Sequence, residues 1–144
     1  MEARVRRDLP GGLQLDDDPE RIDVDAVHDF LSNHAHWALG WSREEVARLV
    51  REAQRVVGLY DGSAVVGFTR TVSDGHWITY LADCYVLPSH RGRGLGHELV
   101  RETVEAGPYK DHGWLLHTAC ASGLYKKFGF VMRSEYLMER PATS

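Results

Sequence analysis

One stretch of this sequence, SHRGRGLGHELV, alternates three glycines with arginines and then runs directly into an apolar-periodic segment typical of a helix. The glycines are Gly92, Gly94 and Gly96. The first amides of a helix have no partners within the helix and lie at the positive end of its dipole. Because glycines remove the side chains that would stand in the way, a diphosphate could accept hydrogen bonds from these amides. Arg91 and Arg93 would add charge-assisted bonds to the phosphates.

Other phosphate-binding patterns do not fit this stretch. The Walker A pattern G-x-x-x-x-G-K-[ST] is absent from the sequence. The dinucleotide pattern G-x-G-x-x-G fails in both registers, because it would need a glycine at His97 or at Leu99. An RNA-binding arginine–glycine tract would continue as a repeat, whereas this one ends. The remaining alternative is a tight strand-to-helix turn without a ligand, although three glycines exceed what such a turn needs.

A second group of candidate residues lies in the stretch HWITYLADCYVLP, which precedes the glycines. Asp83 stands there among apolar neighbours, and a carboxylate in such surroundings needs partners. It is a candidate general base or an anchor for a substrate ammonium group, and the equally open alternative is that it binds backbone amides or an arginine. Strand alternation predicts that Asp83 lies on the face opposite Tyr80 and Cys84. His117, in the following strand, has the same two interpretations, and the favoured one is a core histidine with satisfied hydrogen bonds.

The cysteines and the closely spaced histidines favour neither covalent catalysis nor a metal site. Cys84 and Cys120 lack the sequence context of an activated thiol and form no C-x-x-C motif. Two isolated thiols make no disulfide scaffold, and they are typical of a reducing compartment. His34 and His36 form an H-x-H pattern with no third ligand nearby, which favours a solvated surface.

The composition indicates one globular domain with a slightly acidic balance. The chain has 144 residues, 43% of them apolar and 26% charged, which predicts a single domain over residues 1–144. Residues 1–12 are expected to form a frayed or strand-like lead-in to this domain. A net charge of −4 disfavours nucleic acid, so the arginines near the glycines indicate a small anionic ligand. No stretch is apolar for long enough to cross a bilayer and none resembles a signal peptide, so we expect a cytoplasmic protein without a membrane partner.

Hydrophobic periodicity and turn residues predict the elements that position these groups. A helical segment lies around residues 22–35, and a second helix follows Ser42, which forms a capping-box pattern with Glu45. A hairpin that turns at Asp61-Gly62 comes next, followed by a long strand. The remaining predicted elements are a helix over 94–106, a strand over 114–119, a short helix over 121–128 and a final strand over 129–140. The strand–helix–strand unit predicts one parallel pair in a mixed sheet.

Two of these motifs resemble the GNAT superfamily of acyl-CoA-dependent N-acetyltransferases. The hexamer RGRGLG at 91–96, after the strand LADCYVLP, is similar to the family signature R/Q-x-x-G-x-G/A. The stretch ASGLYKKFGF at 121–130 is similar to the family's short helix and following strand, which usually read L-Y-x-K-x-G-F. The resemblance implies a mixed α+β fold with a central, mostly antiparallel sheet. That sheet would be splayed between two neighbouring strands and covered by helices on both faces.

For the glycine stretch, the resemblance implies a site for acetyl-CoA. The pantetheine arm would enter the gap between the strands at 77–87 and 114–119, where it would bond to backbone groups near Cys84, Tyr85 and Val86. Ser122 would either bond to the cofactor or merely cap its own helix. The residues implied for the pyrophosphate are Arg91, Gly92, Arg93, Gly94, Leu95 and Gly96.

The resemblance further implies direct attack of an amine on the thioester. Tyr125 stands where the family places its general acid. Unperturbed pKa values of about 10 for a phenol and about 8.5 for a thiol are close enough for proton transfer between them. The alternative is that Tyr125 is only an aromatic residue of the core. Some relatives carry Glu or His at the positions of Tyr80 and Ala82, so the general base is unassigned, with Asp83 or a chain of waters as candidates. Trp37 and Tyr80 are the expected walls of the acceptor pocket.

We therefore expect an N-acetyltransferase that moves an acetyl group from acetyl-CoA to a primary amine of a small molecule or peptide in a ternary complex, without a metal. The alternative is a non-catalytic GNAT-like module that binds acyl-CoA or a partner protein, because Tyr80 stands where relatives have a carboxylate. A transferase acting on aminoacyl-tRNA would need a basic face, which the net charge disfavours. The fold would allow a homodimer through the late strands.

Overall fold

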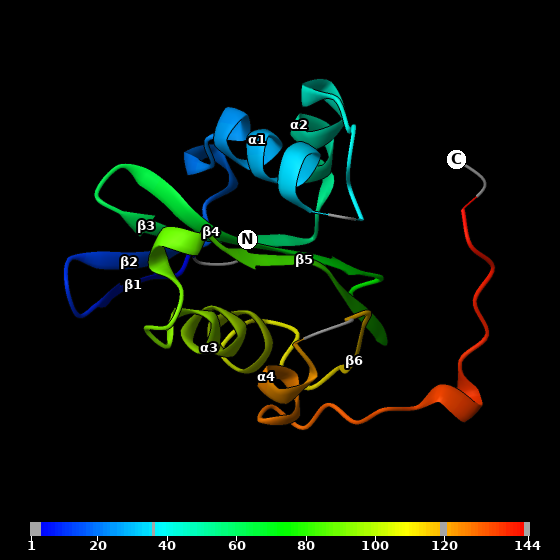
Figure 1. The fold of residues 1–144 in the computed structure, drawn as a ribbon. Helices are drawn as coiled ribbons and strands as arrows, with labels where there is room; N and C mark the ends of the chain where they lie inside the picture. Colours follow the sequence, from blue (N-terminus) through cyan, green and yellow to red (C-terminus); the bar gives the residue numbers. More distant parts are fainter. Residues whose placement is uncertain (1–3, 36, 119–120, 143–144) are drawn as a thin grey trace.

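The computed structural model of the chain describes residues 4–35, 37–118 and 121–142, and in this part it contains one six-stranded sheet between two helical layers (Figure 1). The strands lie side by side in chain order: β1 (Arg6–Leu9), β2 (Leu13–Asp16), β3 (Arg55–Asp61), β4 (Ala64–Ser73), β5 (Ile78–Val86) and β6 (Gly113–Leu116). Neighbouring strands are antiparallel except for β5 and β6, which are parallel. The predicted mixed, mostly antiparallel sheet is therefore confirmed.

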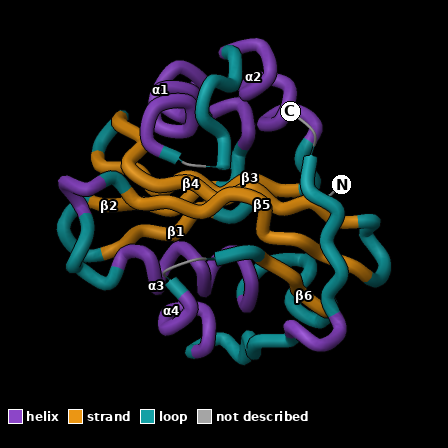
Figure 2. Tube along the Cα trace, turned by 45° about the vertical axis from the view of Figure 1, so that its right-hand side comes forward, coloured by secondary structure: helices purple, strands orange, loops and turns teal. Residues whose placement is uncertain are grey.

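Helices cover both faces of this sheet, as predicted. The helices α1 (Val24–His34) and α2 (Arg43–Glu52) lie on one face, and α3 (Leu95–Val100) and α4 (Ser122–Lys126) lie on the other (Figures 1 and 2). The predicted cap of α2 is present, because the Ser42 side chain accepts from the Glu45 amide and the Glu45 side chain accepts from the Ser42 amide. No helix in the described ranges is both long and apolar enough to span a membrane.

A β-bulge in β5 decides which side chains face which helical layer. Thr71 of β4 pairs with Leu81 and Arg70 pairs with Asp83, so Ala82 is an extra residue in β5. Leu81 packs in the cluster beneath α3 and α4, whereas Tyr85 packs against α1 on the opposite face.

The bulge corrects one prediction from strand alternation. Asp83 lies on the face opposite Cys84, as predicted, because Cys84 packs in the cluster beneath α3 and α4. Its predicted position opposite Tyr80 is wrong, because the extra residue brings Tyr80 and Asp83 onto the same face, toward α1 and α2. Simple alternation holds only as long as each residue of one strand faces one residue of its neighbour.

Both ends of the chain differ from the predicted order. The chain starts with the β1–β2 hairpin, and the order predicted from sequence lacks β2, because four residues are too few for a clear alternating pattern. The predicted final strand over 129–140 is wrong. That segment contains a short 3₁₀ turn at Ser134–Tyr136 and pairs with no strand of the described chain, as Figure 1 shows. Its apolar residues Val131, Met132, Leu137 and Met138 are exposed.

The predicted helix over 94–106 is present, but its second half is wound as a π-helix over Arg101–Glu105. The Ala106 amide bonds to the Arg101 carbonyl, which leaves the next carbonyls without their usual partners. The Arg55 guanidinium takes their place, donating to the Glu102 carbonyl at 2.9 Å. Arg55 also pairs with the side chains of Glu102 and Asp17, so a buried arginine links β3, the π-helix and the chain after β2.

Replacing Arg55 by leucine should therefore destabilise the fold strongly. Loss of the guanidinium removes the ion-pair partner of buried Asp17 and leaves buried Glu102 with Arg7, and breaking a buried pair on one side costs about 3 kcal/mol or more. For a chain of this size we expect the Tm to fall by about 10 °C in a thermal melt. Arg48→Ala, which removes an exposed pair with Glu52, is the control and should lower the Tm by less than about 2 °C. Similar Tm values for the two variants would contradict this prediction.

Candidate acyl-donor and acceptor site

The parallel pairing of β5 and β6 is short, and beyond it the edge of β5 has no partner among the described strands; this open edge is called the gap below. The pairing runs from Ile78–Gly113 to Leu81–Leu116. β5 continues through the bulge to Val86 while pairing with β4 alone among the described strands. This unpaired edge lies where the splay is predicted, and it starts at the bulge. The free edge of β5 leads directly to the glycine stretch.

Two of the three glycines are required by the turn that starts α3. Gly92 and Gly94 have φ angles of +78° and +73°, in the left-handed region where other residues are strained. Gly94 is also the N-cap of α3, and no side chain of the described residues caps this helix. None of the hydrogen bonds formed within residues 4–35, 37–118 and 121–142 uses the backbone amides of residues 92–96 as donors. These amides therefore lie at the helix N-terminus as predicted for an anion site.

The third glycine is not required by the backbone. Gly96 lies in the first turn of α3 and has no positive φ. A Cβ atom at this position would meet only Cδ2 of Leu124, at 3.7 Å, which is an ordinary van der Waals contact. Gly96 therefore lies against Leu124 of α4 with room for a methyl group, so neither backbone strain nor a clash requires a glycine here. The third glycine thus exceeds what a plain strand-to-helix turn needs.

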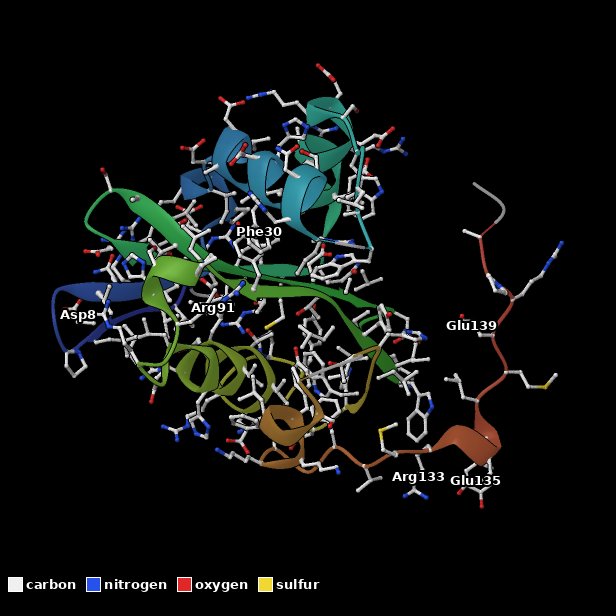
Figure 3. All side chains as sticks on the ribbon, in the orientation of Figure 1. Asp8, Phe30, Arg91, Arg133, Glu135 and Glu139 are labelled. Atoms are coloured by element: carbon white, nitrogen blue, oxygen red, sulfur yellow. The ribbon has the colours of Figure 1, made fainter. Side chains whose placement is uncertain are left out.

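The two arginines of the stretch lie on different sides of it. The Arg91 Nε donates to the Val86 carbonyl at 2.9 Å, which fixes the end of β5. Arg91 also lines a cavity of about 410 Å³ together with Phe30 of α1 (Figure 3). Arg93 lines a separate cavity of about 690 Å³ with Gly94, Leu95 and Lys127. Arg93 and Lys127 form no ion pair within the described part of the chain, so these two cations remain available to an anion.

Tyr125 of α4 lies beneath β5, close to the gap. Its side chain is buried with Leu81 and Val100, and its hydroxyl hydrogen-bonds to the Cys84 thiol. Burial raises the pKa of the Cys84 thiol to about 11, although the bond to Tyr125 opposes the shift. The thiol is therefore protonated at neutral pH and is a poor nucleophile. Ser122 is the first residue of α4, and no side-chain capping hydrogen bond is present at the start of this helix within the described residues.

Asp83 and Trp37 form a link between β5 and the segment that joins α1 to α2. Oδ1 of Asp83 accepts from the Trp37 indole N–H at 2.5 Å, and Oδ2 accepts from the Arg70 Nε at 2.5 Å. The Asp83 side chain has no exposed surface, whereas Trp37 is 40% exposed. Trp37 therefore lies on the α1 and α2 side of the gap. Arg70 gave no signal in the sequence, because its position opposite Asp83 depends on the register of β4 and β5.

Two residues, one of which the sequence did not indicate, connect to Tyr80. The Tyr80 hydroxyl lies 2.5 Å from Nδ1 of His117, and Nε2 of His117 lies 2.8 Å from Oε2 of Glu139. The prediction that His117 is a core histidine is wrong, because its side chain is 55% exposed at the end of β6. Glu139 lies in the segment that was predicted as a strand, and nothing in the sequence indicated its contact.

The other cysteine and histidines contribute less to the site. His36 and Cys120 lie outside the described residues. His34 packs its ring against Phe30, with centroids 5.6 Å apart, and lines the same cavity as Arg91.

Comparison with known proteins identifies relatives over most of the chain. The acetyltransferase (GNAT) domain matches residues 52–132, which include β3 to β6, the glycine stretch and α4. The peptidyl-lysine N-acetyltransferase YjaB of Salmonella typhimurium is 32% identical over 117 residues, covering 80% of this chain and 75% of that protein.

Solved structures have the same architecture. A crystal structure of a protein belonging to the GNAT family from Xanthomonas campestris is similar with a TM-score of 0.83 and 30% identity, covering 90% of this chain and 93% of the other. A GNAT-family acetyltransferase of Streptococcus pneumoniae is similar with a TM-score of 0.72 and 27% identity, covering 92% and 99% of the two chains.

Proposed function

This chain belongs to the GNAT family of N-acetyltransferases, and from that premise we propose that it transfers an acetyl group from acetyl-CoA to a primary amine of a small molecule or peptide. The observation that carries the proposal is the gap between β5 and β6, which opens at the bulge and leads to the uncapped N-terminus of α3. We propose that donor and acceptor meet in this gap in a single ternary complex. A cytoplasmic location would keep the Cys84 thiol reduced.

The residues around the gap fit acetyl-CoA. The amides of residues 92–96 have no acceptor among the described residues, and a Cβ atom at Gly92 or Gly94 would meet nothing within 4 Å. These amides would hold the pyrophosphate, with Arg93 adding charge. Backbone groups near Cys84, Tyr85 and Val86 would bond to the pantetheine arm, and Ser122 would bond to the cofactor from α4. Arg91 would act indirectly, because it holds the Val86 carbonyl. Acetyl-CoA supplies the activated thioester.

We assign Tyr125 as the general acid. Its hydroxyl reaches Cys84 of β5 from the α4 side of the gap, where a departing thiolate would need a proton. Trp37 and Tyr80 would form the acceptor side, because both lie toward α1 and α2. We propose that Asp83 positions this side through Trp37 and Arg70 rather than acting as a base, since both of its oxygens accept hydrogen bonds from these residues.

The proposed acceptor class follows from charge and from one relative. YjaB is a peptidyl-lysine N-acetyltransferase, and an aliphatic amine would suit an acceptor side that combines aromatic rings with carboxylates. The test is release of free coenzyme A thiol from acetyl-CoA over a panel of amines, with lysine peptides, polyamines and aminoglycosides as arms. We expect release that requires both protein and amine. Saturable binding of acetyl-CoA without release in any arm would favour the non-catalytic module instead.

Direct transfer also predicts that Cys84 is dispensable. Replacing Cys84 by alanine removes the thiol that a covalent acyl-enzyme would need, but that thiol is protonated at neutral pH. We expect kcat to change by less than about threefold, because no acyl-cysteine forms. Initial-rate patterns at varied acetyl-CoA and amine should be intersecting lines in both proteins. Parallel lines in the wild type, together with loss of turnover in the variant, would contradict direct transfer.

A further inference from the structure

The hydrogen bond between Tyr80 and His117 lies at the point where β5 and β6 separate. Tyr80 pairs with Leu115, one position before the last pair, and His117 directly follows Leu116 at the end of β6. Glu139 completes the contact from the C-terminal segment, where Figure 3 labels it, at 2.8 Å from the far nitrogen of His117. Three elements distant in sequence thus bring a phenol, an imidazole and a carboxylate into one line beside the gap.

The donors and acceptors of these three groups set the direction in which a proton can move between them. A carboxylate only accepts hydrogen bonds, so Nε2 of His117 carries the hydrogen that Glu139 accepts. In the neutral ring Nδ1 is then an acceptor, and the Tyr80 hydroxyl donates to it at 2.5 Å. The lone pairs of the Tyr80 oxygen remain available to a hydrogen from another group. This arrangement can pass a proton from Tyr80 toward Glu139.

The bulge at Ala82 places this line on the acceptor side. Tyr80 shares a face with Asp83 and Trp37, toward α1 and α2. Tyr125 touches Cys84 from the opposite face. The gap therefore has one phenol on each side. Proton removal from the amine and proton donation to the thiolate can thus take place on opposite sides of it.

We propose that Tyr80, His117 and Glu139 form the relay that takes the proton from the acceptor amine. This inference rests on the proposed function and supplies the base that the function lacks. Tyr80 is the residue that touches the amine, whereas His117 and Glu139 are positioning residues that act through it. No signature residue of the glycine stretch takes part in the relay.

The proton balance of the relay is complete. As the carbon–nitrogen bond forms and the carbon–sulfur bond breaks, one nitrogen-bound proton moves to the Tyr80 oxygen, and the Tyr80 proton moves to Nδ1 of His117. The resulting imidazolium is stabilised by Glu139. Tyr125 supplies the proton of the departing thiol. His117, which is half exposed, returns its proton to water, and Tyr125 recovers one from water.

The charges that face these groups favour a relay over a free phenolate. Asp83 and Glu139 face Tyr80, and Arg70 of β4 opposes them. Glu139 and Tyr80 itself face His117. Burial, followed by the two carboxylates, raises the pKa of the Tyr80 phenol. Tyr80 therefore stays protonated at neutral pH and can accept a proton only by passing on its own.

Substitutions along the relay test the proposal in the full-length protein. We expect Tyr80→Phe and His117→Gln each to lower kcat about 100-fold with an acetyl-CoA Kd unchanged within threefold, and Glu139→Gln to lower kcat about tenfold. The double variant Y80F/H117Q should be no slower than Y80F alone, because the residues act as one unit. Glu135→Gln makes the same charge change on the same segment without contacting His117, and it should leave kcat unchanged. Additive losses in the double variant would overturn the relay.

The histidine ring provides a readout that a structural role would not change. In ¹⁵N NMR of the free protein at neutral pH, Nδ1 of His117 should be unprotonated and its signal should shift in Y80F. A protonated Nδ1 would overturn the relay whether or not any amine is acetylated. Absence of thiol release in wild type would instead count against the proposed function.

Discussion

Replacing Gly96 by leucine is expected to abolish measurable acetyl-CoA binding, whereas replacing it by alanine should leave binding intact. Gly96 lies in the first turn of α3, and a Cβ there would meet only Leu124, at 3.7 Å. Alanine ends at that contact. Leucine adds three carbons in the space between α3 and α4, beside the amides of residues 92–96. Leucine is also a good helix former, so α3 should be retained.

The alanine variant is a useful control because we expect it to raise the stability of the protein rather than to lower it. Alanine is favoured over glycine in a helix by about 0.5–1 kcal/mol, and the signature R/Q-x-x-G-x-G/A accepts alanine here. We therefore expect Gly96→Ala to raise the Tm by about 2 °C and to keep the acetyl-CoA Kd within about threefold of wild type.

Isothermal titration with acetyl-CoA separates the outcomes. A Kd at least 100-fold weaker in Gly96→Leu, with a Tm within about 5 °C of wild type, would support a ligand at the α3 N-terminus. Unchanged affinity in the leucine variant would place the donor elsewhere in the molecule. Gly94 is less suitable for this test, because its φ of +73° would strain any other residue and confuse binding with folding.

Much of the fold was predictable because its signals are local. The capping box of Ser42 and Glu45, the turn at Asp61-Gly62 and the glycines before α3 each act within a few residues. The parallel pairing of β5 and β6 follows from the long connection through α3. These features depend on backbone conformations that the residues themselves favour.

The features that could not be predicted depend on contacts between distant segments. The bulge at Ala82 arises from the register of β4 against β5, and no residue of β5 indicates it. The C-terminal segment has the apolar residues of a strand, but it pairs with no strand of the described chain. The same limit applies to the site: local motifs single out the glycine stretch and Tyr125, whereas the contacts of Arg70 with Asp83 and of Glu139 with His117 depend on segments that are distant in the sequence.

Replacing Tyr125 by phenylalanine should lower kcat about 100-fold or more while leaving the acetyl-CoA Kd within threefold. The ring of Tyr125 is buried among Leu81, Val100 and Phe130, so phenylalanine keeps the packing. Only the hydroxyl beside Cys84 is lost, and a positioned acid contributes about 10²–10⁴-fold to a transfer of this kind. Free-thiol release gives kcat, and titration calorimetry gives Kd.

A matched control variant distinguishes an acid from a packing residue at this position. Tyr136→Phe is the matched control, because Tyr136 is 77% exposed and its hydroxyl lies outside the gap. A Tyr125→Phe variant with wild-type kcat would remove the phenol from the reaction and leave protonation of the thiolate to water. The leaving-group side of the gap would then need only the shape of the ring, because packing against Leu81 and Val100 is all that phenylalanine retains.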